Sequence, residues 1–414
     1  MNASESLNDT LLAHHPAAHA CLSAAGRRMY FPQGIPAQAQ QAKAASINAT
    51  IGQLTDGAGG AIPLPSLANQ VSGVSLEDAT LYAAQGGNKA LRTAWRDRLN
   101  RIGLGPKSNP FCTVGLTHGL SLLSDMFVDE DTDVLLPEPG WGNYKLVFGV
   151  RGGGNIIPYP IFEGGQFAAG SIEKALAKVR SKALLVLNFP GNPTGYTPTA
   201  DELALWLDAI RNSPKPVVVV CDDAYNGFVY EPDRMERSPF FDLADADPQR
   251  VLTAKVDGAT KELCFFGGRV GFVTFGTEGP AAEVLDAKLK GMARANVSSG
   301  PAMSQAMVLS ALNNPNLAQE EADLFQECRA RYQALKTNMI EAGIPHEPFN
   351  SGFFALIPVA GDPNHLRLRL LDEGVGVVAF PQLGAIRIAY SSTSIDDIPA
   401  LVAALARHMG SVAV

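Results

Sequence analysis

The chain has 414 residues, of which 46% are hydrophobic and 18% charged, values typical of a globular protein with more than one ordinary core. Its net charge of −8 and the lack of Lys/Arg clusters argue against a nucleic-acid partner, and no apolar run approaches the ~20 residues of a membrane span. The five cysteines are scattered without a CxxC pair, and the first residues lack a signal-peptide pattern, so we expect a cytoplasmic protein without a disulfide framework or metal site.

The chain divides into an amino-terminal segment and two larger regions. Residues 1–46 are rich in Ala and Gln and are expected to form an arm or helix that packs on a partner. From about residue 66 to 300, strand-like apolar runs alternate with helical patterns, which predicts an α/β protein with a large, doubly wound, mainly parallel sheet. Residues 302–342 are predicted to be helical, with a break at 313–316. We predict an arm and part of a small domain in 1–65, the large domain in 66–305, and the rest of a small α+β domain in 306–414.

The first candidate site elements lie between residues 115 and 144. Gly115-Leu-Thr-His-Gly-Leu reads as a turn that opens an apolar helix, and free backbone N–H groups at such a helix start bind phosphate. This pattern points to the main chain of His118, Gly119 and Leu120. A strand and turn follow, and Trp141 in that turn is either a ring that stacks on a ligand or a packing residue of the core.

A second element is the segment Ala183-Leu-Leu-Val-Leu-Asn-Phe-Pro-Gly-Asn-Pro-Thr-Gly195. Residues 183–187 are predicted to form a buried strand, and 188–195 the turn beyond its carboxyl end. Open α/β sheets bind ligands at that position, where the amide of Asn192 would be free to hydrogen-bond. The alternative is that Asn-Pro-Thr-Gly is only favourable turn chemistry.

The third element begins with four consecutive valines, 217–220, which predict a parallel strand covered on both faces. Asp222 and Asp223 follow at its end, so at least one carboxylate is expected near an apolar interior. A buried carboxylate needs a cationic partner, and the protonated nitrogen of a pyridine ring would be one. The alternative is a cap of the next helix.

Lys261 and Arg269 stand eight residues apart in a Gly-rich, apolar segment that leads into the predicted strand 270–275. A lysine amine condenses with an aldehyde, and an arginine binds a phosphate through two parallel hydrogen bonds. Pyridoxal phosphate carries both groups. The Lys/Arg pair alone is weak evidence, but together with the two upstream elements it predicts a pyridoxal-phosphate site.

Asn-Pro-Thr-Gly, Asp-x-Ala-Tyr and Lys-x7-Arg-x-Gly, in this order, resemble the class I/II pyridoxal-phosphate aminotransferases, and most closely their aspartate/aromatic branch. The resemblance runs from about Ile47 to the C-terminus. It implies that Lys261 forms the Schiff base and that Arg269 anchors the phosphate. It also implies that Asp222 pairs with the pyridinium, while Tyr225 and Asn192 hydrogen-bond the ring 3′-oxygen.

The same resemblance assigns further residues by their surrounding sequence. Trp141 is similar to the aromatic residue that stacks on the cofactor, and Tyr82 to the tyrosine that reaches the phosphate of the neighbouring subunit. Arg387 matches the arginine that binds the substrate α-carboxylate. The remaining two substrate-binding assignments are Gly52, which would line the pocket, and Arg294, which would cross a dimer interface to a side-chain carboxylate or else is an exposed helix-end residue.

Two positions depart from the family pattern. Gly258 stands where the family usually has a phosphate-binding serine, a contact that Thr260 replaces or leaves missing. After Arg294-Ala-Asn, Val297 stands where the branch has an aromatic residue, which puts the preference for a dicarboxylate in question.

The resemblance implies a homodimer that uses pyridoxal 5′-phosphate, with active sites at the interface. It would catalyse ping-pong transamination between an L-amino acid (aspartate, glutamate or an aromatic one) and a 2-oxo acid. The alternatives are a β-lyase or amino-acid decarboxylase with the same residues, and a non-catalytic pyridoxal-binding regulator. The acidic pI and the absence of a basic helix-turn-helix before residue 47 count against the regulator.

Overall fold

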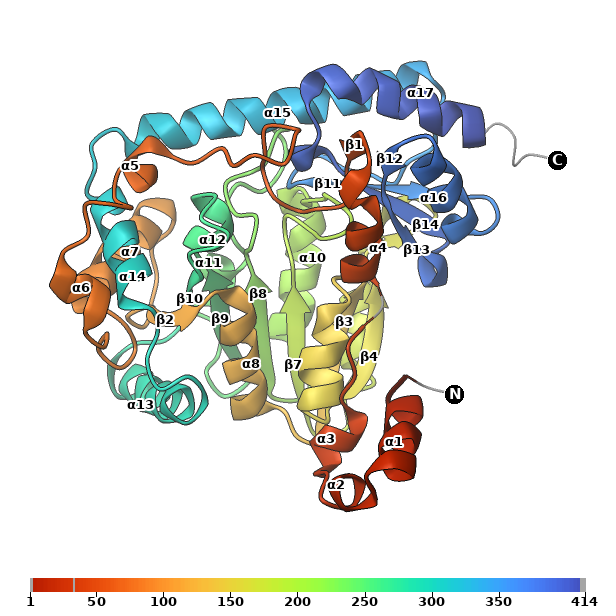
Figure 1. The fold of residues 1–414 in the computed structure, drawn as a ribbon. Helices are drawn as coiled ribbons and strands as arrows, with labels where there is room; N and C mark the ends of the chain where they lie inside the picture. The colour runs from red at the N-terminus through yellow and green to blue at the C-terminus, as the bar shows by residue number, and fades with distance from the viewer. Residues whose placement is uncertain (1–2, 33, 410–414) are drawn as a thin grey trace.

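The computed structural model describes residues 3–32 and 34–409, and its centre is a seven-stranded sheet. From one edge to the other its strands are β2 (Phe111–Val114), β10 (Val270–Phe275), β9 (Val251–Asp257), β8 (Val217–Asp222), β7 (Lys182–Leu187), β3 (Thr132–Glu138) and β4 (Asn155–Pro160). The pairs from β9 to β4 are parallel, and β10 is antiparallel to both of its neighbours. The prediction of a mainly parallel sheet is confirmed, and β7, β8 and β10 lie where the sequence predicted them (Figure 1).

The central strands are mainly apolar because both faces of the sheet are covered. Alternate residues of a strand point to opposite faces, and here Val219 packs into one hydrophobic cluster while Val220 packs into the other. Helical segments cover the two faces and edges: α5 (Pro65–Ala68), α6 (Leu76–Thr80), α7 (Lys89–Ile102), α8 (Leu116–Phe127), η2 (Lys145–Arg151), α9 (Ser171–Leu176), α10 (Ala200–Arg211), α11 (Phe240–Leu243), α12 (Ala259–Glu262), α13 (Gly279–Asn296) and α14 (Ala302–Leu312). Leu120 of α8 belongs to the cluster of Val220, and Trp206 of α10 to that of Val219, so the sheet is doubly wound.

A smaller α+β unit combines the two ends of the chain. Its elements are β1 (Ile47–Asn48), α15 (Leu317–Glu341), β11 (Phe354–Pro358), α16 (Pro363–Asp372), β12 (Val375–Gly376), β13 (Val378–Phe380), η3 (Pro381–Leu383), β14 (Ala385–Ala389), η4 (Tyr390–Ser392), η5 (Ile395–Asp397) and α17 (Ile398–Met409). Strands β11, β14 and β13 form an antiparallel sheet, and β1 pairs in parallel with β12. The pairing of Ile47 with Val375 brings the segment before residue 65 next to the carboxyl-terminal region, while the division of the chain into domains stays a prediction. The break expected within 302–342 is the short connection between α14 and α15 (Figure 1).

The amino-terminal segment is helical. It contains α1 (Ala3–His14), α2 (Pro16–Ala20), α3 (Ala24–Arg28), α4 (Ile35–Gln41) and η1 (Ala42–Ala44), followed by β1. Helices α1–α3 extend below the sheet, whereas α4 lies beside the small unit (Figure 1). Gln38 holds α4 there, because its side chain both donates to the carbonyl of Ala379 (3.0 Å) and accepts from the N–H of Ala379 (2.6 Å).

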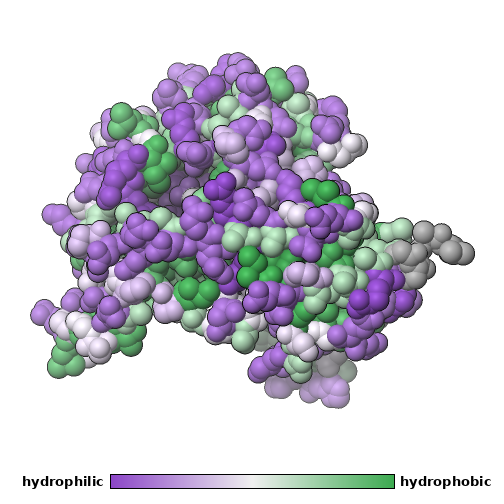
Figure 2. Space-filling view, turned by 90° about the horizontal axis from the view of Figure 1, so that it is seen from above, coloured by the Kyte–Doolittle hydropathy of each residue, from purple (hydrophilic) through white to green (hydrophobic). Residues whose placement is uncertain are grey.

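The exposed surface is mainly hydrophilic in the view from above, with apolar residues in scattered groups (Figure 2). Of the helices in the described ranges, none combines the length and apolarity that crossing a membrane requires. The hairpin β5 (Phe162–Glu163) and β6 (Gln166–Phe167) completes the described strands.

Candidate active site

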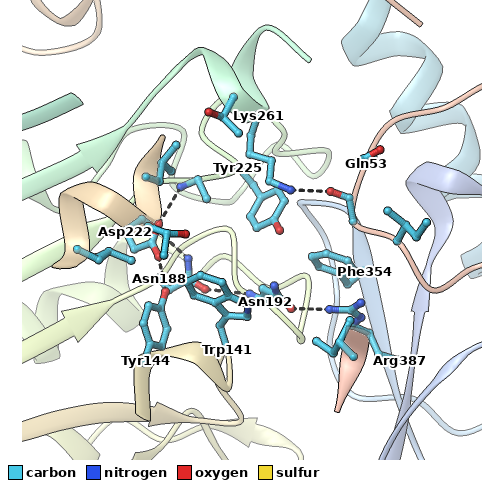
Figure 3. A pocket seen from close by; sticks show the side chains of 18 of the residues that line it. Gln53, Trp141, Tyr144, Asn188, Asn192, Asp222, Tyr225, Lys261, Phe354 and Arg387 are labelled. Atoms are coloured by element: carbon cyan, nitrogen blue, oxygen red, sulfur yellow. Dashed lines mark hydrogen bonds between the residues drawn. The ribbon is translucent and has the colours of Figure 1, made fainter. Parts of the chain in front are cut away.

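A cavity of about 310 Å³ lies at the carboxyl ends of β7 and β8, where the large sheet faces β14. The residues predicted from the sequence that line it are Gly52, Leu120, Trp141, Asn192, Asp222, Tyr225, Lys261, Arg269 and Arg387. They come from segments spread over most of the chain, and the fold brings them together (Figure 3). Tyr82, His118, Gly119 and Arg294 are not among the lining residues.

Lys261 stands on the one-turn helix α12 and extends into the cavity (Figure 3). Its Nζ donates to the carbonyl oxygen of Gly52 at 2.6 Å and lies 5.3 Å from the ring centre of Tyr225. Burial, together with the positive charges of Arg387 and Arg269, lowers the pKa of this amine to about 8. A substantial fraction of the amine is therefore neutral at a mildly basic pH, and a neutral amine can act as a nucleophile or a base.

Asp222 ends β8 on the wall of the cavity, with 3% of its surface exposed. Its Oδ2 accepts a hydrogen bond from the hydroxyl of Tyr144 at 2.5 Å, and its Oδ1 accepts from the N–H of Ala224 at 3.3 Å. Burial raises the pKa of the carboxyl to about 6, although the hydrogen bond from Tyr144 opposes this shift. At neutral pH the cavity thus contains a carboxylate with no cationic partner among the ion pairs of residues 3–32 and 34–409.

Asp223, the next residue, is held in a different network. Its Oδ2 accepts from Nζ of Lys255 at 2.5 Å, and the same Nζ lies 3.3 Å from Oδ2 of Asp257. Asp257 also accepts from the indole N–H of Trp95 at 3.1 Å. All of these polar groups are buried, and Asp223 is not a lining residue of the cavity. Of the two neighbouring aspartates, only Asp222 is available to a ligand.

The amino end of α8 and Arg269 form the side of the cavity that suits an anion. The first backbone N–H groups of a helix lack partners within the helix, and Leu116 and Thr117 of this turn line the cavity. Gly115 precedes them with φ +74°, and a Cβ on it would lie 2.3 Å from Nη2 of Arg269. The glycine therefore leaves the space that the guanidinium occupies. The predicted helix start does lie at the cavity, where Leu116, Thr117 and Leu120 are lining residues but His118 and Gly119 are not. Binding of a phosphate by its main chain stays a prediction.

A steric constraint explains why a glycine stands at position 258, where the family pattern has a serine. Gly258 has φ +154°, and a Cβ on it would lie 2.5 Å from Cα of Gly271. No serine fits there without a shift of the backbone. Thr260 does line the cavity, but its hydroxyl donates to the carbonyl of Val270 at 3.1 Å, so a contact from it to a phosphate stays a prediction.

Arg387 projects from β14 into the opposite side of the cavity (Figure 3). Its Nη1 donates to Oδ1 of Asn192 at 3.0 Å, its Nη2 donates to the carbonyl of Thr50 at 2.7 Å, and its guanidinium stands 4.2 Å from the ring centre of Phe354. Burial lowers its pKa to about 10, so it remains a cation at neutral pH. No carboxylate in the described residues forms an ion pair with it, and its buried Nε has no hydrogen-bond partner there. A buried, unpaired arginine of this kind favours an anionic ligand.

The charges of the lining residues support the same conclusion. Lys261, Arg269 and Arg387 are basic, and Asp222 is the acidic lining residue. The cavity therefore has an excess of positive charge, and it offers a negative group at one wall. This arrangement fits a ligand with a phosphate and a protonated ring nitrogen, together with a substrate carboxylate.

The side chains of three of the four predicted residues outside the cavity lining have other surroundings in this chain. Tyr82 is 93% exposed, and it lines a separate surface groove that reaches Arg269. Arg294 is exposed in the last turn of α13, where its Nη1 donates to the hydroxyl of Ser298 at 3.0 Å. Nδ1 of His118 accepts from the N–H of Val114 at 3.0 Å, which makes this histidine a local hydrogen-bonding residue.

Sequence reasoning missed five lining residues with evident contacts. The hydroxyl of Tyr144 donates to the carboxylate of Asp222, and the side chain of Asn188 donates to the main-chain carbonyl of Asp222. The ring of Phe354 stacks on the guanidinium of Arg387. Gln53 and Ile35 also line the cavity. Tyr144 could have been suspected from its place three residues after Trp141, and Asn188 from its place at the end of a buried strand. Ile35 and Phe354 have no local signal, because only the tertiary fold brings them here.

Comparison with known proteins decides the family. The sequence profile described as "Aminotransferase class I and II" matches residues 44–405, which is most of the chain. The chain belongs to the class I and II aminotransferase family. This aminotransferase is 27% identical to the "Probable aspartate/prephenate aminotransferase" of Aquifex aeolicus, over 64% of each chain. It is 24% identical to "Aromatic-amino-acid aminotransferase 2" of Thermococcus litoralis, over 73% of this chain and 72% of that one.

The aminotransferase also shares its fold with a solved structure. An aminotransferase from Anaerococcus prevotii superposes with a TM-score of 0.84 at 22% identity, covering 92% of this chain and 98% of the other. At this identity the likeness shows the fold alone. Membership of the family confirms an enzyme of the transaminase type, and amino acids and 2-oxo acids are the substrates that this implies.

Proposed function

We propose that this aminotransferase holds pyridoxal 5′-phosphate on Lys261 and transfers an amino group from an L-amino acid to a 2-oxo acid by a ping-pong mechanism. The observation that carries the proposal is the convergence of Lys261, Asp222, Arg269 and Arg387 on one cavity. Their charges match the aldehyde, ring nitrogen and phosphate of the cofactor and the carboxylate of the substrate. When bound, the cofactor would supply an electron sink for bond cleavage at the substrate Cα.

Each of these residues has a defined task in the proposal. Arg269 and the amino end of α8 would hold the phosphate, and Asp222 would keep the ring nitrogen protonated. Arg387 and Asn192, which already share a hydrogen bond, would hold the α-carboxylate and fix the orientation of Cα. Once the substrate displaces it from the cofactor, Nζ of Lys261 would move the proton from Cα, which its lowered pKa favours at neutral to mildly basic pH.

The amino donor is proposed to be aspartate, glutamate or an aromatic amino acid; the names of the two relatives mention aspartate and aromatic amino acids for their own reactions. A second carboxylate would need a cation besides Lys261, Arg269 and Arg387. Arg294 would supply it only from a neighbouring subunit, since it is exposed and outside the cavity of its own chain. The dicarboxylate part of the proposal therefore depends on a dimer.

Covalent trapping tests the proposal directly. The protein is incubated with pyridoxal phosphate, reduced with borohydride and mapped by peptide mass spectrometry. We expect the pyridoxyl group on Lys261. Labelling of the surface lysine Lys182 or the sealed Lys255 instead would overturn the site assignment. Conversion of 2-oxo acid to amino acid, rather than release of CO₂ or of a β-substituent, separates transamination from decarboxylase and lyase chemistry.

A further inference from the structure

The hydrogen bond between Tyr144 and Asp222 lies at the wall of the cavity and joins two fully enclosed side chains. Tyr144 precedes η2, is 1% exposed, and donates its hydroxyl to Oδ2 of Asp222 at 2.5 Å. Trp141 meets its ring edge-to-face at a centroid distance of 5.3 Å, and Phe148 packs on its other side at 6.4 Å. The ring is thereby fixed, and the hydroxyl has a defined direction toward the carboxylate (Figure 3).

A buried carboxylate in this position tends to take up a proton, which would remove its charge. Desolvation is the largest influence on Asp222 and raises its pKa to about 6, whereas the Tyr144 hydrogen bond is the largest influence in the opposite direction. The other hydrogen bond to the carboxylate, from the N–H of Ala224, is long at 3.3 Å. Hydrogen bonds to a charged acceptor are about twice as strong as neutral ones. The hydroxyl is thus the main group in the chain that favours the ionised form.

We propose that Tyr144 is a positioning residue that keeps the Asp222 carboxylate ionised and directed at the ring nitrogen of the cofactor. This inference rests on the proposed function, because it assigns Tyr144 a task toward the same ligand. Tyr144 acts only through Asp222. Its contribution must therefore depend on pH, on the ring nitrogen and on the presence of the carboxylate.

The chain offers a matched control. Tyr159 is also fully buried, and its hydroxyl donates to a main-chain carbonyl, that of Val186, at 2.5 Å. It is not a lining residue of the cavity. Tyr144→Phe and Tyr159→Phe therefore delete the same atom from equally enclosed sites, and only the first deletion touches Asp222.

The test measures the dissociation constant of pyridoxal phosphate from pH 5 to 9. Protonation of Asp222 in the free protein competes with binding, so affinity falls as the pH drops through the pKa of about 6. Without the hydroxyl this pKa rises, and the fall should begin about one unit higher. Tyr144→Phe should therefore bind about tenfold more weakly than the parent protein at pH 5 and equally at pH 9. The cofactor's own titrations are the same for every variant and cancel in the ratio.

Two further measurements tie the effect to Asp222. An analogue of the cofactor with carbon in place of the ring nitrogen should bind Tyr144→Phe and the parent protein alike. The double variant Tyr144→Phe/Asp222→Asn should bind pyridoxal phosphate no more weakly than Asp222→Asn alone. If Tyr144→Phe folds poorly, 3-fluorotyrosine in place of Tyr144, a stronger donor, should move the pH dependence downward instead.

Several outcomes would overturn the inference. These are a deficit that is the same at every pH, a deficit equal to that of Tyr159→Phe, or a deficit that persists with the carbon analogue or without the Asp222 carboxylate. Failure of the proposed function would look different, because the parent protein itself would then bind no pyridoxal phosphate.

Discussion

Asp222 and Asp223 are neighbours in the chain, yet strand alternation gives them different surroundings. Asp222 faces the cavity with Tyr144, whereas Asp223 is sealed against Lys255. The residues alone predicted only that at least one of the two carboxylates lies near an apolar interior, and the family resemblance assigned Asp222 to the ligand. The contacts of these two side chains separate one that lines the cavity from one that is paired with a buried lysine.

Asp222→Asn should therefore bind the cofactor but lower turnover by about a hundred-fold or more, because the ring nitrogen loses its anionic partner. Asp223→Asn should keep most of the turnover and instead lower the midpoint of urea unfolding, since it removes one of the two carboxylates near Lys255. Steady-state kinetics and urea titrations of both variants check this. The reverse assignment of the two losses would show that Asp223 is the ring partner.

The pH dependence of Lys261 provides a second prediction at this scale. Burial and the nearby arginines disfavour its ammonium form, so labelling of Lys261 by an amine reagent in the cofactor-free protein should rise through about pH 8. Arg387→Met removes the larger of the two arginine contributions, and the midpoint should then move to higher pH. Arg294→Met, which changes an exposed arginine outside the cavity, should leave the midpoint unchanged. Peptide mass spectrometry of the labelled protein measures the rates.

Among the elements, ion pairs join β9 to the residue after β8, and α12 to α7. Lys255 of β9 contacts Asp223 and Asp257, and Glu262, the last residue of α12, accepts from Arg98 of α7 at 3.0 Å. The same arginine donates to Glu321 of α15 at 2.7 Å. The short helix that carries Lys261 is thus joined through Arg98 both to α7 and to the long helix α15.

Lys255→Met should lower the free energy of unfolding at pH 7 by about 3–5 kcal/mol, because it leaves buried carboxylates without their cation. Burial already raises the pKa of Asp223, and loss of Lys255 removes the attraction that opposed this. The folded variant then binds more protons than the unfolded chain, so its deficit should shrink from pH 7 to pH 5. Lys288→Met, on the exposed surface of α13, should change the stability by less than about 0.5 kcal/mol. A deficit that grows on acidification would contradict this account.

The sequence was sufficient for elements whose signal is local. Four valines predicted β8, and the turn residues after β7 placed Asn192 beyond the sheet edge, because an apolar strand and its terminating turn are encoded in adjacent residues. The helix break before α15 was read from Asn and Pro in the same way. The prediction was less accurate at His118. The start of the helix was placed correctly, but the residues of its first turn that line the cavity are not all the predicted ones.

Contacts between distant segments could not be read in this way. Tyr144 meets Asp222, and Phe354 meets Arg387, only after separate strands have assembled. The sequence showed that Gly258 departs from the family pattern. The reason that a glycine is needed there is the close approach of Gly271 in the neighbouring strand, which only the fold reveals. Tyr82 and Arg294 are predicted to act on another subunit, and the structure contains a single chain. Their roles therefore remain predictions.

For the whole molecule, Tyr82 and Arg294 are exposed, so the roles predicted for them would require a dimer. Tyr82 lines a surface groove that also contains Arg269 and Val297, so a partner seated there would be close to the phosphate end of the cavity. Sedimentation velocity should accordingly show a dimer. An active monomer would remove the case for shared sites.

Donor specificity tests the same arrangement. Arg294→Ala should weaken kcat/KM for aspartate and glutamate by about ten- to a hundred-fold while leaving alanine and phenylalanine nearly unchanged, because only a side-chain carboxylate loses its partner. Arg387→Ala is the matched comparison, and it should weaken all four donors alike. An equal loss for all donors in Arg294→Ala would leave a general aminotransferase without dicarboxylate preference.

The parallel pairing of β1 with β12 has a consequence for the protein while it is being made. Ile47 emerges from the ribosome long before its partner Val375, because most of the large domain lies between them in the sequence. The strands of the large sheet are complete by Phe275 and can begin to assemble during translation, whereas Gly52 and Arg387 reach the cavity only when both chain ends meet. A nascent chain can therefore present Asp222 and Lys261 before β14 brings Arg387 to the cavity, so we expect the cavity to be complete only after β14 has been made.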